Sequence, residues 1–317
     1  MKGCMLDQRT FDRGDIRMGG LLGRLDEWAH YPSSRHAQAA ERIAGCGVVI
    51  TNKVRLDRDT VLGADALRLV ILAATGTDNV DLDACRERGV VVCNTIRYSR
   101  PAVVQHTFAL MLNLMTGLPA YREDVRNGGW SGSDIFCLLD HPIRELQGKT
   151  LGIVGFGDIG GRVADIGRAF GMNIAVAARP GTDPGGDRLA MDDFLSLADV
   201  ISLHCPLTPR THHLLSRTQF QKMKPGAALI NTARGAIIHD EALAWALRTG
   251  EIAGAGIDVL DEEPPPPDHP LLAADIPNLI VTPHNAWGTL ESRQRLVAQM
   301  EECLAAWQAG TPRNVVT

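Results

Sequence analysis

The sequence has no long run of apolar residues. Its most apolar segments, such as residues 69–74, are far shorter than the ~20 residues that a membrane-spanning helix needs. No apolar stretch after Met1 and Lys2 has the length of a signal peptide. We therefore expect a cytoplasmic protein that contacts no membrane.

The sequence also has no large excess of positive or negative charge. The chain has 32 Lys and Arg against 37 Asp and Glu, which gives a formal net charge of -5, and no long block of like charges occurs. A surface that binds nucleic acid concentrates positive charge, and none is concentrated here. The expected partner is a small molecule, with no nucleic acid.

The cysteines do not form a recognisable framework. There are 7 of them, an odd number, and no two have the CxxC spacing. That pattern favours reduced thiols over disulfides or a zinc site. The pairs His204-Cys205 and His212-His213 are not accompanied by a four-ligand spacing, so we expect no metal.

What the sequence does have is the composition of a globular protein and a repeated α/β pattern. Its 317 residues are 45% hydrophobic and 22% charged, and single cores usually stop growing near ~250 residues, so two domains are expected. Nearly continuous apolar runs separated by helical patterns predict a doubly wound parallel sheet. The predicted strands are residues 151–155, 174–178, 199–203, 227–231, 254–259 and 279–282.

The first hundred residues predict a smaller α/β domain, with strands at residues 48–51, 69–74 and 90–93. Ser99 and Pro101 mark the start of a long helix, and a last helix over residues 290–307 could return to this domain. We therefore predict a discontinuous substrate domain, residues 1–98 and 289–317, and a dinucleotide-binding domain, residues 99–288.

A glycine-rich turn follows the first strand of the larger domain. It has the spacing GxGxxG and leads into an amphipathic helix over residues 158–170. Gly155 permits the tight turn, Gly157 lets the backbone approach a pyrophosphate, and Gly160 lets the helix pack on the strand. This pattern predicts a dinucleotide site whose turn is Gly155, Phe156, Gly157, Asp158, Ile159 and Gly160.

The second strand of that domain ends at Ala178-Arg179, without the carboxylate that usually holds the ribose 2′-OH of NAD. Arg179 is suited to a 2′-phosphate, since a guanidinium forms charge-assisted hydrogen bonds with phosphate oxygens. The alternative is a solvated surface arginine. NADP is favoured over NAD.

Three polar residues follow three of the predicted strands: Arg234, Glu263 and His284. Reduction of a 2-oxo acid needs a cation for the carboxylate, an acid for the carbonyl oxygen and a carboxylate that supports the acid. Each residue taken alone has a structural alternative, such as a surface ion pair or a hydrogen-bonded histidine. Together they predict an enzyme that transfers a hydride to or from a small 2-hydroxy or 2-oxo acid.

The chain resembles the D-isomer-specific 2-hydroxyacid dehydrogenase family, and within it the glycerate dehydrogenase (hydroxypyruvate and glyoxylate reductase) branch. The resemblance extends over nearly the whole chain and implies a Rossmann-type domain, a flavodoxin-like domain and a cleft between them. The motifs that carry it are residues 74–79, 145–155, 202–207, 231–235, 256–259, 263–264 and 283–284.

The resemblance also implies roles. Arg234 would bind the substrate carboxylate, His284 would donate the proton, and Glu263 would orient and charge that histidine. Thr75, Gly76 and Thr77 would bind the carboxylate through their backbone, and Asp258 would hold the nicotinamide carboxamide. Further residues would contact the cofactor: Ala178, Arg179, Cys205, Pro206, Thr211, Thr232, Ala233 and His284.

Three points stay open. Trp287 either narrows the substrate pocket, which favours glyoxylate and hydroxypyruvate, or packs at an interface. Other substrates within the family are phosphoglycerate, a bulkier 2-oxo acid or phosphite, and a related corepressor uses the dinucleotide only as a signal. The resemblance implies a homodimer through the dinucleotide-binding domain, to which residues 121–146 would contribute.

Overall fold

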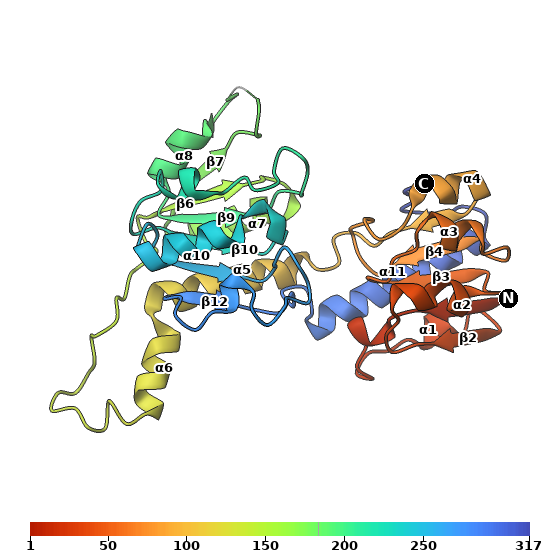
Figure 1. The fold of residues 1–317 in the computed structure, drawn as a ribbon, viewed down its shortest axis with the longest axis horizontal. Coiled ribbons are helices and arrows are strands. Elements are labelled where there is room, and N and C mark those ends of the chain that lie inside the picture. The colour runs from red at the N-terminus through yellow and green to blue at the C-terminus, as the bar shows by residue number, and fades with distance from the viewer. Residues whose placement is uncertain (183) are drawn as a thin grey trace. The chain divides into compact units, whose positions relative to one another are not determined.

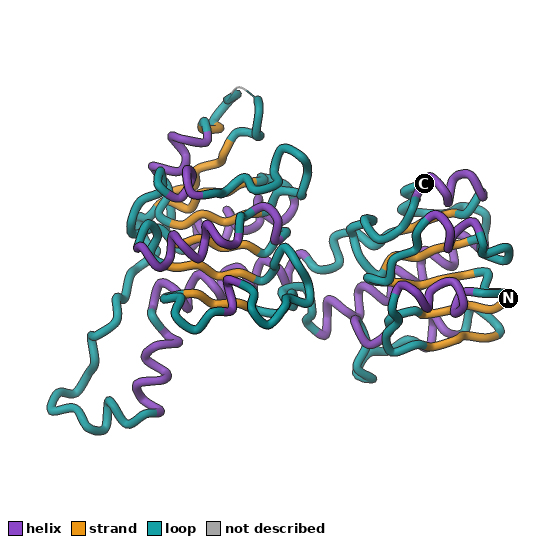
Figure 2. Tube along the Cα trace, in the orientation of Figure 1, coloured by secondary structure: helices purple, strands orange, loops and turns teal. Residues whose placement is uncertain are grey.

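The computed structural model describes residues 1–182 and 184–317, and they form two compact units, each built on its own sheet (Figure 1). Unit 1 consists of Met1–Ala102 and Trp287–Thr317, and unit 2 of Val103–Ala286. Strands and helices alternate along both units (Figure 2). No helix in the described part of the chain is long and apolar enough to cross a membrane.

Unit 2 contains a seven-stranded sheet in the order β12-β11-β10-β9-β6-β7-β8, and all neighbouring strands are parallel. After β6, the chain adds β7 and β8 on one side of this strand and then returns to add β9 to β12 on the other side. This is the doubly wound order, in which the ligand crevice lies where the direction of building reverses. The strands are β6 Thr150–Val154, β7 Asn173–Ala177, β8 Arg188–Leu189, β9 Val200–Leu203, β10 Ala228–Asn231, β11 Gly254–Ile257 and β12 Leu279–Val281.

Helices cover both faces of this sheet, as the continuous apolar strands predict. One core contains buried residues of α8 (Met191–Leu197), α9 (Arg217–Phe220) and α10 (Asp240–Thr249). The other contains buried residues of α5 (Arg100–Thr116) and α7 (Asp158–Ala169). The six predicted strands are confirmed, and β8, with only two residues, was not predicted because so short a strand has no apolar run.

Unit 1 contains a five-stranded parallel sheet in the order β2-β1-β3-β4-β5, the order of a flavodoxin-like domain. The helices α2, α3 and α4 contribute to one core, and α1 and α11 to the other. The elements are β1 Lys2–Met5, α1 Gly19–Leu22, β2 Glu27–His30, α2 Ala39–Ile43, β3 Val48–Thr51, α3 Arg58–Leu62, β4 Leu69–Leu72, α4 Leu82–Arg88, β5 Val91–Cys93 and α11 Leu290–Gln308.

The sequence predicted β3, β4, β5 and the last helix but not β1 and β2. The edge strand β2 has the sequence EWAH, and none of its residues is fully buried, so it shows neither an apolar run nor a clear alternation. In β1, Gly3 weakens the strand pattern, yet a Cβ there would lie 2.6 Å from the Trp28 ring. The close contact between β1 and β2 therefore requires glycine at position 3, and the same glycine makes β1 hard to recognise in the sequence.

Candidate active site

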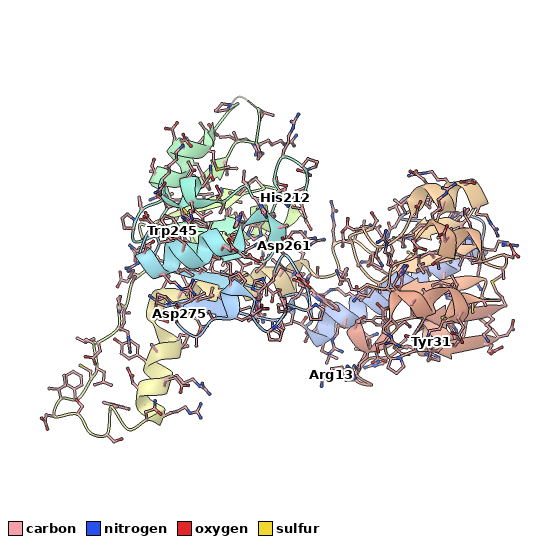
Figure 3. All side chains as sticks on the ribbon, in the orientation of Figure 1. Arg13, Tyr31, His212, Trp245, Asp261 and Asp275 are labelled. Atoms are coloured by element: carbon pink, nitrogen blue, oxygen red, sulfur yellow. The ribbon has the colours of Figure 1, made fainter. Side chains whose placement is uncertain are left out.

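The predicted site residues of unit 2 follow the carboxyl ends of its strands. Because the strands are parallel, the loops after β6, β7, β9, β10, β11 and β12 all lie at one edge of the sheet. In Figure 3, His212 and Asp261, which follow β9 and β11, lie at this edge, whereas Asp275, which precedes β12, lies at the opposite one. The order of the strands therefore places the glycine-rich turn and the polar residues along one line.

The turn after β6 has the close contacts that its glycines predict. Gly155 has φ +94°, and a Cβ there would lie 2.5 Å from the backbone N of Cys205. A Cβ on Gly160 would lie 2.2 Å from the carbonyl oxygen of Gly155. Beside Gly157, in contrast, a Cβ would meet nothing within 4 Å. The turn therefore packs tightly at Gly155 and Gly160 and leaves space beside Gly157, at the start of α7. This arrangement fits a pyrophosphate at the helix N-terminus.

At the end of β7, Ala178 is buried and its N–H donates to the carbonyl of Leu189. Arg179 is exposed, and the Thr182 hydroxyl donates to its carbonyl oxygen at 2.9 Å. None of the ion pairs among residues 1–182 and 184–317 includes the Arg179 side chain. This end of the site therefore offers a cation and no carboxylate on β7.

The loop after β9 is held by its own hydrogen bonds. The buried Thr211 hydroxyl donates to the carbonyl of Pro206 at 2.7 Å, so this side chain fixes the loop from inside. Burial raises the pKa of the Cys205 thiol to about 11, which keeps it protonated at neutral pH, and lowers the pKa of His204 to about 4. Neither side chain has the charge state of a nucleophile or an acid.

After β10, the fully buried Asn231 shapes the segment that carries Arg234. Its side-chain oxygen accepts the N–H of Ala233 at 3.0 Å, and its amide donates to the carbonyl of Arg234 at 2.9 Å. The half-buried Arg234 donates to the Ala233 carbonyl, and the Thr232 hydroxyl lies 3.2 Å from that of Thr107. No role was predicted for Asn231, although an asparagine at a strand end beside a charged residue is a signal for such a turn.

Glu263 and His284 come together although they are 21 positions apart along the chain, with a run of prolines between them. His284 Nδ1 lies 2.5 Å from Glu263 Oε2. A carboxylate only accepts hydrogen bonds, so Nδ1 carries the hydrogen, and Nε2 is the ring nitrogen on the side away from Glu263. The other oxygen, Glu263 Oε1, accepts the N–H of Leu260 at 3.0 Å, which fixes the carboxylate.

The backbone of His284 is in the left-handed region, with φ +49°. This conformation is unfavourable for a histidine and persists only where surrounding bonds impose it. Here the N–H of His284 donates to the Asp258 carbonyl at 2.8 Å. The Asp258 carboxylate, 1% exposed, accepts the N–H groups of Asn285 and Ala286 at 3.0 and 2.9 Å. Asp258 thus fixes the segment that carries His284.

A further network behind this segment was not predicted. Thr282 Oγ1 donates to Asp258 Oδ1 at 2.6 Å, and His106 Nε2 lies 2.9 Å from the same hydroxyl oxygen. Because the single hydroxyl hydrogen goes to the carboxylate, His106 must donate through Nε2. His106 lies on α5, 152 residues before Asp258 along the sequence. The only signal for it was a polar residue inside an otherwise apolar helix stripe.

We expect Asp258→Asn to destabilise unit 2 by about 1–3 kcal/mol, because one amide NH2 would face buried N–H donors. Turnover should fall as well, since the carboxylate holds the N–H groups of Asn285 and Ala286, which directly follow His284. Urea unfolding followed by circular dichroism would measure the first effect. Asp261→Asn is the control, because Asp261 is exposed in the same loop region; equal midpoints for both variants would contradict the role of Asp258.

The predicted residues of unit 1 lie in the loop after β4. The Thr75 hydroxyl donates to the Thr95 carbonyl at 2.8 Å, and Asn94 donates to the Thr75 carbonyl at 2.8 Å. Gly76 and Thr77 continue this loop, and the N–H of Val80 closes it on the Thr77 carbonyl. Trp287 belongs to unit 1, is half-buried and meets the Tyr98 ring edge-on at 6.1 Å.

The histidines that the sequence paired do not suggest a metal site. His212 and His213 have ring centroids 3.9 Å apart, and His239 lies 4.8 Å from His213. Within the residues that the structure describes, no group of three or more His, Cys, Asp or Glu side chains could hold a metal ion.

Comparison with protein families identifies residues 108–286 as matching the family model described as "D-isomer specific 2-hydroxyacid dehydrogenase, NAD binding domain". The chain is 40% identical over 291 residues to a glycerate dehydrogenase of Methylorubrum extorquens, covering 92% of each protein. It is 34% identical over 322 residues to a hydroxypyruvate reductase of Blautia hydrogenotrophica, covering 100% of this chain and 99% of the relative.

The solved structures agree with these matches. A protein from Thermus thermophilus superposes with a TM-score of 0.87 and 36% identity, covering 100% of both chains. The similarity therefore extends over both units and not only over the dinucleotide-binding part.

Proposed function

The chain belongs to the D-isomer specific 2-hydroxyacid dehydrogenase family and is an oxidoreductase of 2-hydroxy acids; from this premise we propose that it reduces glyoxylate and hydroxypyruvate to the corresponding 2-hydroxy acids. The observation that carries the proposal is the His284–Glu263 pair, which joins the loops after β12 and β11 at the same sheet edge as Arg234, in the loop after β10. An acid and a cation at one edge, beside an open glycine turn, suit the reduction of a small carbonyl compound.

The cofactor would lie along this edge, with its pyrophosphate at Gly155–Gly160 and its nicotinamide toward the loops after β10 to β12. When bound, it supplies or accepts the hydride at C2 of the substrate. The chain itself must then bind the acid and deliver a proton. Arg234 binds the substrate carboxylate through its guanidinium fork.

His284 donates the proton from Nε2 to the carbonyl oxygen, because Nδ1 is held by Glu263. Glu263 fixes the ring and offsets the positive charge of its protonated form. The backbone of Thr75, Gly76 and Thr77 supplies further donors to the substrate carboxylate. Asp258 would hold the nicotinamide carboxamide, and it fixes the segment that carries His284.

Loss of absorbance at the reduced-nicotinamide band tests this function, with glyoxylate and hydroxypyruvate each combined with NADPH and NADH. We expect turnover with both acids. Turnover with phosphoglycerate, with a bulkier 2-oxo acid or with phosphite alone would instead assign another substrate. Cofactor binding without turnover of any acid would favour the dinucleotide-sensing corepressor.

For the cofactor we propose NADP over NAD, since Arg179 stands where an NAD enzyme has a carboxylate near the ribose. Arg179→Gln should raise the KM for NADPH about tenfold, the loss expected for one charge-assisted hydrogen bond, and leave the KM for NADH unchanged. Initial rates at a saturating acid concentration give both values. A wild-type enzyme with a lower KM for NADH would overturn the preference.

We also propose a homodimer through unit 2. The segment after α6 (Leu118–Arg126) projects away from the sheet of unit 2 (Figure 1). It also exposes apolar side chains. Phe136 is 90% and Leu139 75% exposed, and Trp130, Ile135 and Ile143 of the same segment are exposed as well. Such a group of exposed apolar residues is typical of a contact between chains. A second copy of this chain would cover them.

The double variant Phe136→Asp/Leu139→Asp is expected to be monomeric, because two buried carboxylates oppose association. Light scattering coupled to gel filtration measures the mass. The control places the same charges at Leu197 and Leu272, which are exposed on unit 2 outside this segment. If both double variants remain dimers, the interface lies elsewhere.

A cytoplasmic location completes the proposal and accords with seven unbridged cysteines.

A further inference from the structure

Arg210 lies beside the loop that carries Arg179, although 30 residues separate the two along the chain. The two loops approach each other at Gly181, where an added Cβ would lie 4.0 Å from Arg210 Cδ. Gly181 has φ +73°, so the chain reverses there, two residues after Arg179. The loops after β7 and β9 therefore meet at the point where the sequence places the ribose end of a dinucleotide.

The backbone around Arg210 is fixed before any ligand binds. The N–H of Thr208 donates to Thr211 Oγ1 at 2.7 Å, and the N–H groups of Thr211 and His212 donate to the Thr208 carbonyl at 3.0 and 2.9 Å. Arg210 sits inside this turn and is exposed. A ligand contact there would cost side-chain ordering and little backbone ordering.

Three arginines of the described residues lie on or next to these two loops. None of the ion pairs of the described residues includes Arg179, Arg188 or Arg210. Arg188 Nη1 instead donates to the carbonyl of Ala177 at 3.4 Å, at the end of β7. Three guanidinium groups, two on neighbouring loops and one on β8, with alanine at position 178, suit an anion with several acceptor oxygens.

We propose that Arg210 is a specificity-determining residue that binds the 2′-phosphate of the cofactor together with Arg179. This inference rests on the proposed use of NADP and extends it to a second loop. A phosphate monoester carries about -1.5 to -2 charges at neutral pH, enough to engage two guanidinium groups. The loop after β9 thus contributes to the choice of cofactor, in addition to the end of β7.

Direct binding of NADPH and NADH tests the proposal without substrate or turnover, because the two differ only by the 2′-phosphate. Fluorescence titration gives a Kd for each. Arg210→Gln is expected to weaken NADPH about tenfold and to leave NADH within about twofold of wild type. Arg210→Lys keeps the positive charge but not the planar guanidinium. Its Kd for NADPH should therefore lie between those of the wild type and Arg210→Gln. Arg168→Gln is the control, because Arg168 is an exposed arginine in the last turn of α7, paired with Asp165.

The outcomes separate this inference from the proposed function. A wild type that prefers NADPH, with the same preference in Arg210→Gln, overturns the role of Arg210 and leaves the NADP proposal standing. Equal weakening of NADPH and NADH also overturns it, since the side chain would then support the loop generally. A wild type without preference for NADPH overturns the NADP proposal itself, and the inference with it.

Discussion

Replacing His284 with asparagine is expected to lower kcat for reduction of the 2-oxo acid by about 10³-fold, the usual contribution of a positioned general acid. Asparagine has no titratable proton to give the carbonyl oxygen. It is also one of the few residues that tolerate the left-handed backbone of position 284, where φ is +49°. The loss therefore reports the missing acid and not a distorted loop. Initial rates with saturating acid and cofactor measure it.

Two companion variants make this result specific. His284→Ala should lose a similar factor in kcat and also some stability, because alanine is strained at this φ. Glu263→Gln retains an oxygen for the N–H of Leu260 but removes the charge beside the ring, so a smaller loss of about tenfold is expected. In all three variants NADPH should still bind, as its fluorescence reports. If His284→Asn keeps wild-type kcat, another group donates the proton.

The sequence was most informative where one segment alone determines the structure. Strands such as β9 and β10 are buried on both faces, so their apolar runs identify them without knowledge of their neighbours. The GxGxxG turn is largely local in the same sense, since φ +94° at Gly155 and the close approach of Gly160 to the Gly155 carbonyl both lie within one strand-turn-helix unit. The proposed catalytic residues were singled out because they follow predicted strands and match family motifs.

The sequence was least informative about contacts that depend on distant segments. The position of Glu263 relative to His284 could not be predicted across the run of four prolines, because the path of a loop depends on what it packs against. The support of Asp258 by Thr282, and the bond from His106, join residues 24 and 176 positions apart. A polar residue in an apolar helix stripe marks His106 locally, but the local pattern does not tell which distant side chain this histidine contacts.

Gly235, directly after Arg234, is expected to be the least replaceable glycine near the site. A Cβ there would lie 1.9 Å from the carbonyl carbon of Leu260 and 2.3 Å from the backbone N of Asp261. These are backbone atoms, which cannot move aside as a flexible side chain can. Gly235→Ala must therefore push the loop after β10 away from the loop after β11, and we expect a loss of about 3 kcal/mol of stability.

The same displacement reaches the chemistry, because one loop carries Arg234 and the other carries Glu263, whose carboxylate is anchored on Leu260. Turnover of Gly235→Ala should fall at least about 10²-fold, since small errors in position are costly in an active site. Gly161→Ala is the matched control: a Cβ at this α7 position meets nothing within 4 Å, and alanine favours the helix by up to about 1 kcal/mol. The urea midpoint should fall for the first variant and not for the second. A Gly235→Ala enzyme with wild-type stability and turnover would mean that the two loops do not approach each other this closely in solution, and that the positions of Arg234 and Glu263 are set independently.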